Sequence, residues 1–189
     1  MSVRRLRSDA EANRARILEV AAAAFRSMGT RVPMSKIAER AEVGVGTLYR
    51  HYPDREHLLA ALEQHSYELT LGLAGEAAQR SETGLESLRF YLDAIIRNRD
   101  SLFLPLHGGP MSSDRSSVGL RQAIAANIAA ILDRGHRDGS VRVDAVPLDV
   151  VVGGTFLCLP LPNTTNWDEI AERQLQIFLD GLRPPSTHR

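Results

Sequence analysis

The sequence contains a single cysteine, a single lysine and no long run of apolar residues. One cysteine excludes an internal disulfide, and the apolar neighbours of Cys158 favour a buried small hydrophobic residue in a reducing compartment. No stretch approaches the roughly 20 apolar residues that a membrane-spanning helix needs. The basic residues 1–14 lead into no apolar signal core. We therefore expect a cytoplasmic protein that does not bind a membrane.

Motifs of the common enzyme classes are also missing. Gly44 and Gly46 lack the third glycine and the preceding strand of a dinucleotide-binding loop. The six histidines show no HExxH or other metal-ligand spacing, and the sequence has no nucleophile elbow. The sequence therefore predicts a protein that is not an enzyme and that holds no cofactor and no metal.

The formal net charge of zero is divided unevenly along the chain. Residues 1–57 carry 11 Lys and Arg against 7 Asp and Glu, whereas residues 58–189 carry 12 against 16. Arg4, Arg5 and Arg7 belong to the positive excess, and we expect them to form a mobile basic arm. Positive charge gathered in one small region is typical of a phosphate-binding surface.

Residues 34–52 predict a helix-turn-helix, because apolar residues recur at i, i+3, i+4 and i+7 on both sides of a short turn. The first set is Met34, Ile37, Ala38 and Ala41, and the second is Val45, Leu48, Tyr49 and Tyr52. We expect Leu48, Val43 and Tyr52 to pack inside. In such a motif the second helix lies in the DNA major groove.

Capping and helix-ending residues predict the helices around this motif. Ser8 and Glu11 form a capping-box pair, so a helix should run from about residue 9 to residue 28 and end at Gly29. Asp54 is a good N-cap for a helix that reaches about residue 80. Helical periodicity predicts further helices near 82–97, 99–106, 115–138, 147–159 and 167–182. No strand is predicted, so we expect an all-α fold.

Several segments of the chain closely resemble TetR-type bacterial transcriptional regulators. They are GVGTLYRHY at 44–52, DREHL at 54–58, AAAAFRSMG at 21–29 and IAERAEV at 37–43, about the first third of the chain. The resemblance implies a three-helix helix-turn-helix DNA-binding domain over residues 8–53. It also implies a helical ligand-binding and dimerisation domain over residues 54–185.

The resemblance further implies which residues contact double-stranded DNA. At the positions of Val45, Gly46 and Thr47, members of this family approach the bases. Thr47 can hydrogen-bond a base edge, and the methyl groups of Val45 can contact a thymine methyl. The other expected contacts, to phosphates or nearby bases, come from Ser35, Lys36, Tyr49, Arg50, His51 and Arg55.

A small-molecule effector and a homodimer are also implied by the resemblance. The residues expected to line a ligand cavity are Phe90, Ile96, Arg97, Phe103, His107, Ile124, Asn127, Ile128 and Phe156. Residues 149–159 are apolar nearly all round, which predicts burial on more than one side, and Gly153 and Gly154 would allow close helix approach. The last two helices would then form a four-helix bundle between two subunits, or else lie in the chain's own core.

The predicted function is therefore a dimeric repressor that binds a palindromic operator and is released by an unknown effector. A DNA-binding regulator without a ligand, or a transcriptional activator, would share the same motif. A ligand-induced shift in melting temperature would separate the ligand-free alternative from a ligand-responsive repressor. A helical protein that binds only other proteins also stays open, and salt-dependent DNA binding would exclude it.

Overall fold

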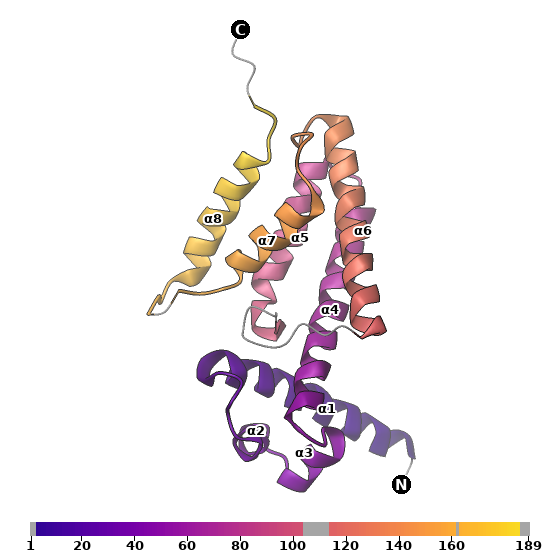
Figure 1. Cartoon of the computed structure of the whole chain (residues 1–189), viewed down its shortest axis with the longest axis vertical. Helices are drawn as coiled ribbons and strands as arrows, with labels where there is room; N and C mark the ends of the chain where they lie inside the picture. Colours follow the sequence, from indigo (N-terminus) through magenta and orange to yellow (C-terminus); the bar gives the residue numbers. More distant parts are fainter. Residues whose placement is uncertain (1–2, 104–113, 162, 186–189) are drawn as a thin grey trace. The chain divides into compact units, whose positions relative to one another are not determined.

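The computed structural model of the chain describes residues 3–103, 114–161 and 163–185. Every regular element in these ranges is a helix, which confirms the predicted all-α fold (Figure 1). The elements are α1 (Val3–Met28), α2 (Met34–Arg40), α3 (Val45–His51), α4 (Arg55–Gln79), α5 (Gly84–Arg97), the 3-10 helix η1 (Arg99–Ser101), α6 (Arg115–Asp138), α7 (Pro147–Leu157) and α8 (Trp167–Gly181). Within the described ranges, none of these helices combines the length and apolarity that crossing a bilayer requires.

The chain packs into two compact units. The first unit comprises residues 1–66 and 100–117, and the second comprises residues 67–99 and 118–189. The long helix α4 therefore gives its first half to one unit and its second half to the other. The division at residue 54 stays a prediction, and the packing adds to the first unit a segment that lies far along the chain.

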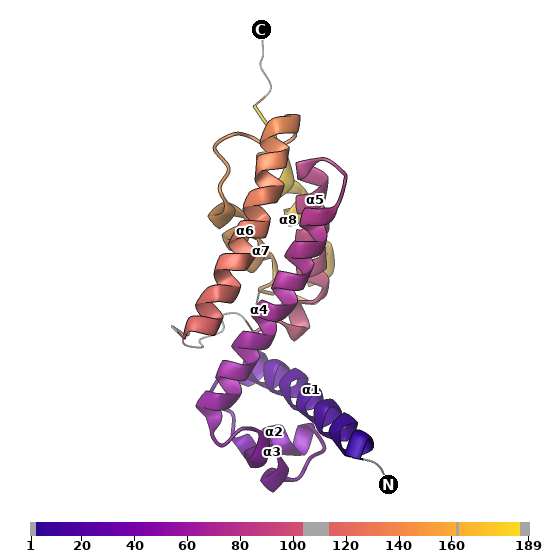
Figure 2. The same ribbon diagram turned by 90° about the vertical axis from the view of Figure 1, so that its right-hand side faces the viewer.

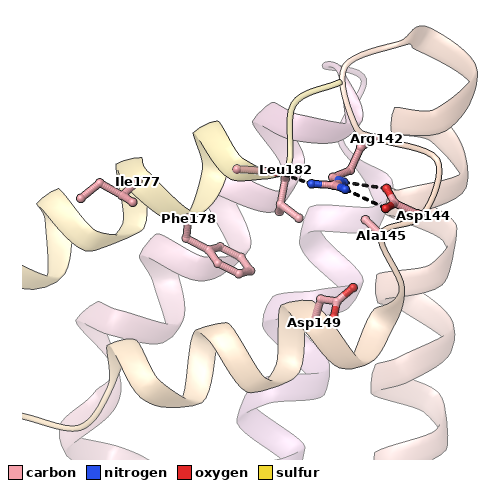
Figure 3. Close-up of a pocket in the computed structure, with 8 residues that line it drawn as sticks. Arg142, Asp144, Ala145, Asp149, Ile177, Phe178 and Leu182 are labelled. Atoms are coloured by element: carbon pink, nitrogen blue, oxygen red, sulfur yellow. Dashed lines mark hydrogen bonds and ion pairs between the residues drawn. The ribbon is translucent and has the colours of Figure 1, made fainter. Parts of the chain in front are cut away.

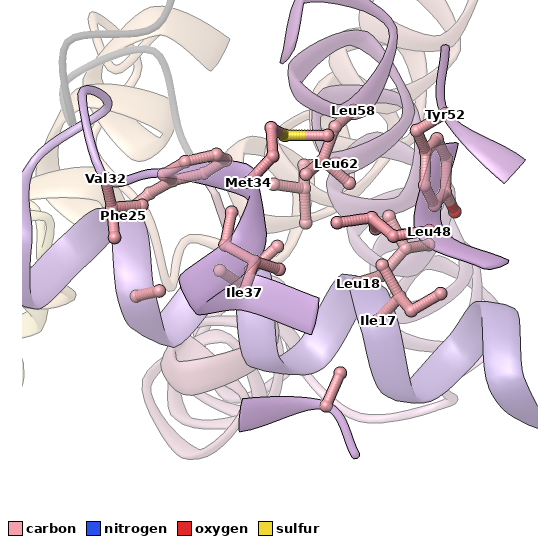
Figure 4. Close-up of a cluster of buried hydrophobic side chains, with 14 of the residues drawn as sticks. Ile17, Leu18, Phe25, Val32, Met34, Ile37, Leu48, Tyr52, Leu58 and Leu62 are labelled. Atoms are coloured by element: carbon pink, nitrogen blue, oxygen red, sulfur yellow. The ribbon is translucent and has the colours of Figure 1, made fainter. Parts of the chain in front are cut away.

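One hydrophobic core holds α1, α2, α3 and the start of α4 together (Figure 4). The predicted stripe on α2 is confirmed, since Met34, Ile37, Ala38 and Ala41 are all buried. The segment after η1 joins the same core, where the ring centroids of Phe25 and Phe103 lie 5.8 Å apart.

The first helix begins at Val3, earlier than predicted. Ser8 lies inside α1 rather than at its N-cap, and the prediction that Arg4, Arg5 and Arg7 form a mobile arm is wrong because they lie in the helix. Residues 3–11 contain no Gly or Pro, and several of them are good helix formers. An N-cap serine contributes only about 1 kcal/mol, so its preference does not stop a helix that its neighbours favour.

The predicted helix over residues 99–106 is also wrong in its described part. Only η1 forms there, and residues 104–106 lie outside the described residues. Leu102 and Phe103 leave the helical path to become buried, and the Phe103 amide donates a 2.7 Å hydrogen bond to the Ser66 hydroxyl.

In the second unit α5 packs against α7 and α8, which also pack against each other (Figure 1, Figure 2). A capping box starts α5, with the Glu86 amide donating to the Thr83 hydroxyl and the Thr83 amide donating to the Glu86 carboxylate. The close approach predicted for two glycines serves packing within the chain. A methyl group on Gly153 would lie 2.6 Å from the Phe178 ring, and one on Gly154 would lie 2.9 Å from Leu92.

Candidate nucleic-acid interface

The turn between α2 and α3 is tight and depends on backbone geometry. Glu42 takes a left-handed conformation with φ of 55°, which side chains other than glycine adopt uncommonly. The Val43 amide then donates to the Ala38 carbonyl at 3.0 Å, and Gly44 caps α3 by accepting from the Thr47 amide at 2.8 Å. This turn fixes the direction of α3 relative to α2.

α3 buries one face and exposes the other. Leu48 is fully buried and Tyr52 is 3% exposed, and Val43 packs partly buried against the same core, as predicted. Val45 and Tyr49 are 44% and 46% exposed, so the second half of the predicted apolar repeat divides between inside and outside. A helix of seven residues that presents a valine and a tyrosine to solvent is available for a partner.

The side chains beside these two residues are polar. Arg50 lies on the surface and donates from Nε to the Gly46 carbonyl at 3.1 Å, a bond that directs its guanidinium along α3. Thr47 and His51 are half-buried, and the His51 ring lies against the Tyr52 ring with centroids 6.3 Å apart. The exposed face of α3 thus combines apolar contact area with a cation and hydrogen-bonding groups.

Ser35 and Lys36 open α2 on the surface of the first unit. The Lys36 ammonium pairs with the Glu39 carboxylate at 2.9 Å, and both side chains are exposed. Exposed pairs of this kind contribute about 0–1 kcal/mol, so a phosphate can compete for the lysine at small cost.

Arg55 has a structural partner that the sequence did not reveal. Its Nη1 atom donates to the carbonyls of Thr30 and Val32, at 2.5 and 2.6 Å, and so ties the start of α4 to the turn before α2. Main-chain carbonyls more than 20 residues away leave no side-chain pattern in a sequence. The phosphate contact expected of Arg55 would have to come from its other nitrogen atoms.

The cap of α4 is as predicted. The His57 amide donates to the Asp54 carboxylate at 2.9 Å, and the His57 ring lies 2.8 Å from the same oxygen. These hydrogen bonds hold the pKa of Asp54 below its ordinary value. In the preceding residues burial raises the pKa of the Tyr52 phenol, which agrees with its packed position.

The residues expected to line a ligand cavity occupy different surroundings. Ile96, Ile124 and Ile128 are buried in the second unit, and Phe103 belongs to the core of the first. His107 lies outside the described residues.

Four further members of that set lie nearer the surface of the second unit. The Arg80 guanidinium lies over the Phe90 ring, 4.1 Å from the ring centroid. The side-chain amide of Asn127 lies near Gly75. Arg97 is exposed and pairs with Asp93, and Phe156 is 63% exposed. A pocket of about 500 Å³ is instead lined by Arg142, Asp144, Ala145, Asp149, Ile177, Phe178, Gly181 and Leu182 (Figure 3).

Two family profiles match this chain. The profile described as bacterial regulatory proteins of the tetR family matches residues 17–62, from the middle of α1 through the first turns of α4. A profile for the C-terminal domain of SbtR-like transcriptional regulators matches residues 99–184. The chain belongs to the TetR family of bacterial transcriptional regulators. Because TetR-family members are regulators rather than enzymes, family membership supports the prediction of a non-enzyme.

Several TetR-family proteins are similar to this chain over most of its length. The transcriptional repressor KstR of Mycolicibacterium smegmatis is 28% identical over 164 residues, 83% of this chain and 79% of KstR. The crystal structure of a TetR regulator from Mycobacterium vanbaalenii is 28% identical, with a TM-score of 0.63 over 95% of this chain and 99% of that one. A gamma-butyrolactone receptor shares the fold, at 23% identity and a TM-score of 0.61 over 89% of this chain and 99% of the receptor.

Proposed function

We propose that this TetR-family protein is a homodimeric repressor that binds a palindromic operator through α3 and is released by a small-molecule effector. The observation that carries the proposal is the division of α3 into a buried face around Leu48 and an exposed face around Val45 and Tyr49. A helix placed in this way can enter a DNA major groove without unfolding its own core.

The N-terminal turn of α3 supplies the base contacts in this proposal. Val45, Gly46 and Thr47 lie there, where the side chains are short and the backbone can come close to base edges. Phosphate contacts fix the position of α3 in the groove and come from Ser35, Lys36, Tyr49, Arg50, His51 and Arg55. Contacts to phosphates alone give affinities of about 10⁻⁴ to 10⁻⁶ M, so specific binding calls for two such heads.

An exposed apolar face on the last two helices supports the homodimer. It is formed on α7 by Leu148, Val151, Val152 and Phe156 and on α8 by Ile177, with exposures of 66, 39, 43, 63 and 55%. The opposite face of α7, with Val150 and Leu157, packs inside the second unit. Large contiguous apolar surfaces mark sites of association. Two copies joined there would make the four-helix bundle that the family resemblance implies.

Release by an effector requires only modest coupling. An effector that favours the DNA-incompetent arrangement by about 1–3 kcal/mol weakens operator binding roughly 5- to 150-fold. A relative of the same fold is named for a lactone ligand, which supports a small-molecule effector here. Its site would lie among α4, α5 and α6, near Ile96, Ile124, Asn127 and Ile128.

A regulator that needs no effector is the second candidate. The tight packing of Ile128, which is fully buried, and the place of Phe103 in the core of the first unit favour it. A screen of small apolar and lactone compounds for a raised melting temperature separates the two functions. Stabilisation by one compound class, together with loss of operator binding, supports the ligand-responsive repressor.

Selection of bound fragments from random duplex DNA tests the proposed function directly. We expect an inverted repeat whose half-sites are centred about one helical turn, 10–10.5 base pairs, or a multiple of it apart. A single asymmetric site, or recovery of no sequence above background, would contradict the palindromic operator.

A further inference from the structure

The pocket beside α7 and α8 contains an acidic group, Asp149, that makes no ion pair with any residue in the described ranges. The positive charge of Arg142 is paired with Asp144, because its Nε and Nη2 atoms donate to the two Asp144 carboxylate oxygens at 2.6 and 2.7 Å (Figure 3). This contact also holds the pKa of Asp144 below its ordinary value. Asp149 points toward the same space and accepts one hydrogen bond, from the Val146 amide at 2.9 Å.

The remaining surroundings favour a cation in this pocket. Asp149 makes no ion pair with a described residue, and Gly181 at the C-terminal end of α8 also lines the pocket, its carbonyl accepting a 3.4 Å hydrogen bond from Arg142 Nη1. Phe178 and Ile177 supply apolar and aromatic surface. A guanidinium group on an aliphatic stem fits such a site, since its charge can meet the carboxylate while its stem lies on the apolar wall.

The chain itself carries a guanidinium suited to this pocket. Arg173 is exposed on α8, one turn before Ile177, and makes no hydrogen bond or ion pair with any residue that the structure describes. Asp149 shares a face of α7 with Val152 and Phe156, at spacings i, i+3 and i+7. The surface that would join two copies therefore includes Asp149 and Arg173, which make no ion pair with each other or with another residue that the structure describes.

Two-fold symmetry turns these single charges into a matched set. In an isologous interface, if residue i contacts residue j then j also contacts i, so one complementary contact forms twice. Burying the charge of Arg173 or Asp149 in the interface without a partner of opposite charge would destabilise the dimer. We propose that Arg173 of a second copy enters this pocket and pairs with Asp149, with the reciprocal pair forming across the interface. This inference rests on the proposed homodimer.

Sedimentation equilibrium of the full chain in the absence of DNA tests the pairing through a double-mutant cycle. Arg173→Glu places a carboxylate against Asp149, and we expect the dimer dissociation constant to rise at least tenfold. Asp149→Asn removes the charge but keeps an oxygen to accept from the Val146 amide, so the chain should fold normally and dissociate about fivefold more readily. In the Asp149→Asn background, Arg173→Glu should raise the dimer dissociation constant by less than about threefold, because the repulsion between the two carboxylates is gone.

Controls separate this pairing from general charge effects and from loss of the dimer. Arg40→Glu changes the net charge by the same amount as Arg173→Glu but lies on the first unit, so it should leave the dissociation constant unchanged. Melting temperatures check that each variant folds. An equal cost of Arg173→Glu in both backgrounds, or a wild-type dimer indifferent to Arg173→Glu, overturns the pairing while the homodimer stands. A wild-type monomer at micromolar concentration overturns the homodimer and the pairing together.

A free organic cation is the competing occupant of the pocket. Benzamidine, an aromatic cation, is the probe, and binding is measured by calorimetry on wild type and Asp149→Asn. If benzamidine binds wild type only, and Arg173→Glu leaves the dimer unchanged, the pocket is a small-molecule site and the pairing is wrong. If benzamidine weakens the dimer and Asp149→Asn abolishes that effect, the probe and Arg173 compete for one carboxylate, which supports the pairing.

Discussion

Two helix faces of this protein expose large apolar side chains, and their surroundings differ. On α3, Val45 and Tyr49 stand among Thr47, Arg50 and other polar groups. On α7, the exposed apolar residues Leu148, Val151, Val152 and Phe156 recur at helical spacing, and Ile177 of the neighbouring helix α8 is exposed as well. Isolated apolar groups among cations suit a polar, charged partner such as DNA, whereas a continuous apolar face suits a surface like itself. Exposure marks both sites, and the neighbouring side chains distinguish them.

The strongest test of this comparison contrasts the two sides of α3. Leu48→Ala removes a fully buried side chain from the core that holds the helix-turn-helix, so we expect a loss of about 2–5 kcal/mol in the free energy of unfolding. Val45→Ala, on the exposed side, should change it by less than about 0.5 kcal/mol. Urea denaturation of both variants measures the difference. Equal losses would show that α3 has no outward face.

The apolar face of α7 is tested by a charge at its most exposed aromatic residue. Phe156→Glu should weaken self-association at least about 100-fold, because the interface would have to bury an unpaired carboxylate. The melting temperature of the monomer should not fall, since Phe156 is exposed within the chain. Sedimentation equilibrium gives the dissociation constant. A dimer of unchanged affinity would place the subunit contact elsewhere.

The exposed tyrosine of α3 tests the DNA-binding face. We expect Tyr49→Ala to weaken DNA binding at least tenfold without lowering the melting temperature, because Tyr49 contributes contact area to the partner and little to the core. A gel-shift assay on a selected duplex measures this. Val143→Ala is the control, since it removes an apolar side chain that is 82% exposed and lies between α6 and α7, outside both helix faces. Equal affinity of Tyr49→Ala and wild type would refute the contact.

The smallest expected effect concerns the cap of α4. Asp54→Ala should lower the melting temperature by about 2–4 °C at pH 7. Hydrogen bonds depress the pKa of Asp54 in the folded state, so its contribution is complete above the ordinary value of 3.8 and is lost as the pH falls through the lowered pKa. The difference from wild type should therefore shrink below about pH 3.8. A difference independent of pH would assign the effect to helix propensity alone.

Much of the secondary structure followed from local signals in the sequence. The ends of α5, α6, α7 and α8 lie within two residues of the predicted ones, because capping residues, glycines and prolines act over a single turn. Local signals also misled at the start of α1, where a plausible cap at Ser8 competed with helix-forming neighbours. The exposed face of α3 was predicted only in part from the sequence, since periodicity does not say which residues of an apolar repeat stay exposed.

Long-range contacts were beyond local reasoning. Nothing near Arg55 indicates that it binds the carbonyls of Thr30 and Val32. Likewise, no pattern around Phe103 places its ring against Phe25 rather than among the residues expected to line a ligand cavity. Such contacts join segments more than 20 residues apart, so they depend on how whole helices pack.

The sequence by itself determined the class of this protein: an all-helical regulator with a helix-turn-helix, because helix periodicity and turn chemistry are local properties of the chain. Only the tertiary structure decided which apolar side chains are left for partners, which glycines serve internal packing, and which part of the chain after α5 joins the first unit. Burial is a property of neighbours in space, and those neighbours come from distant parts of the sequence.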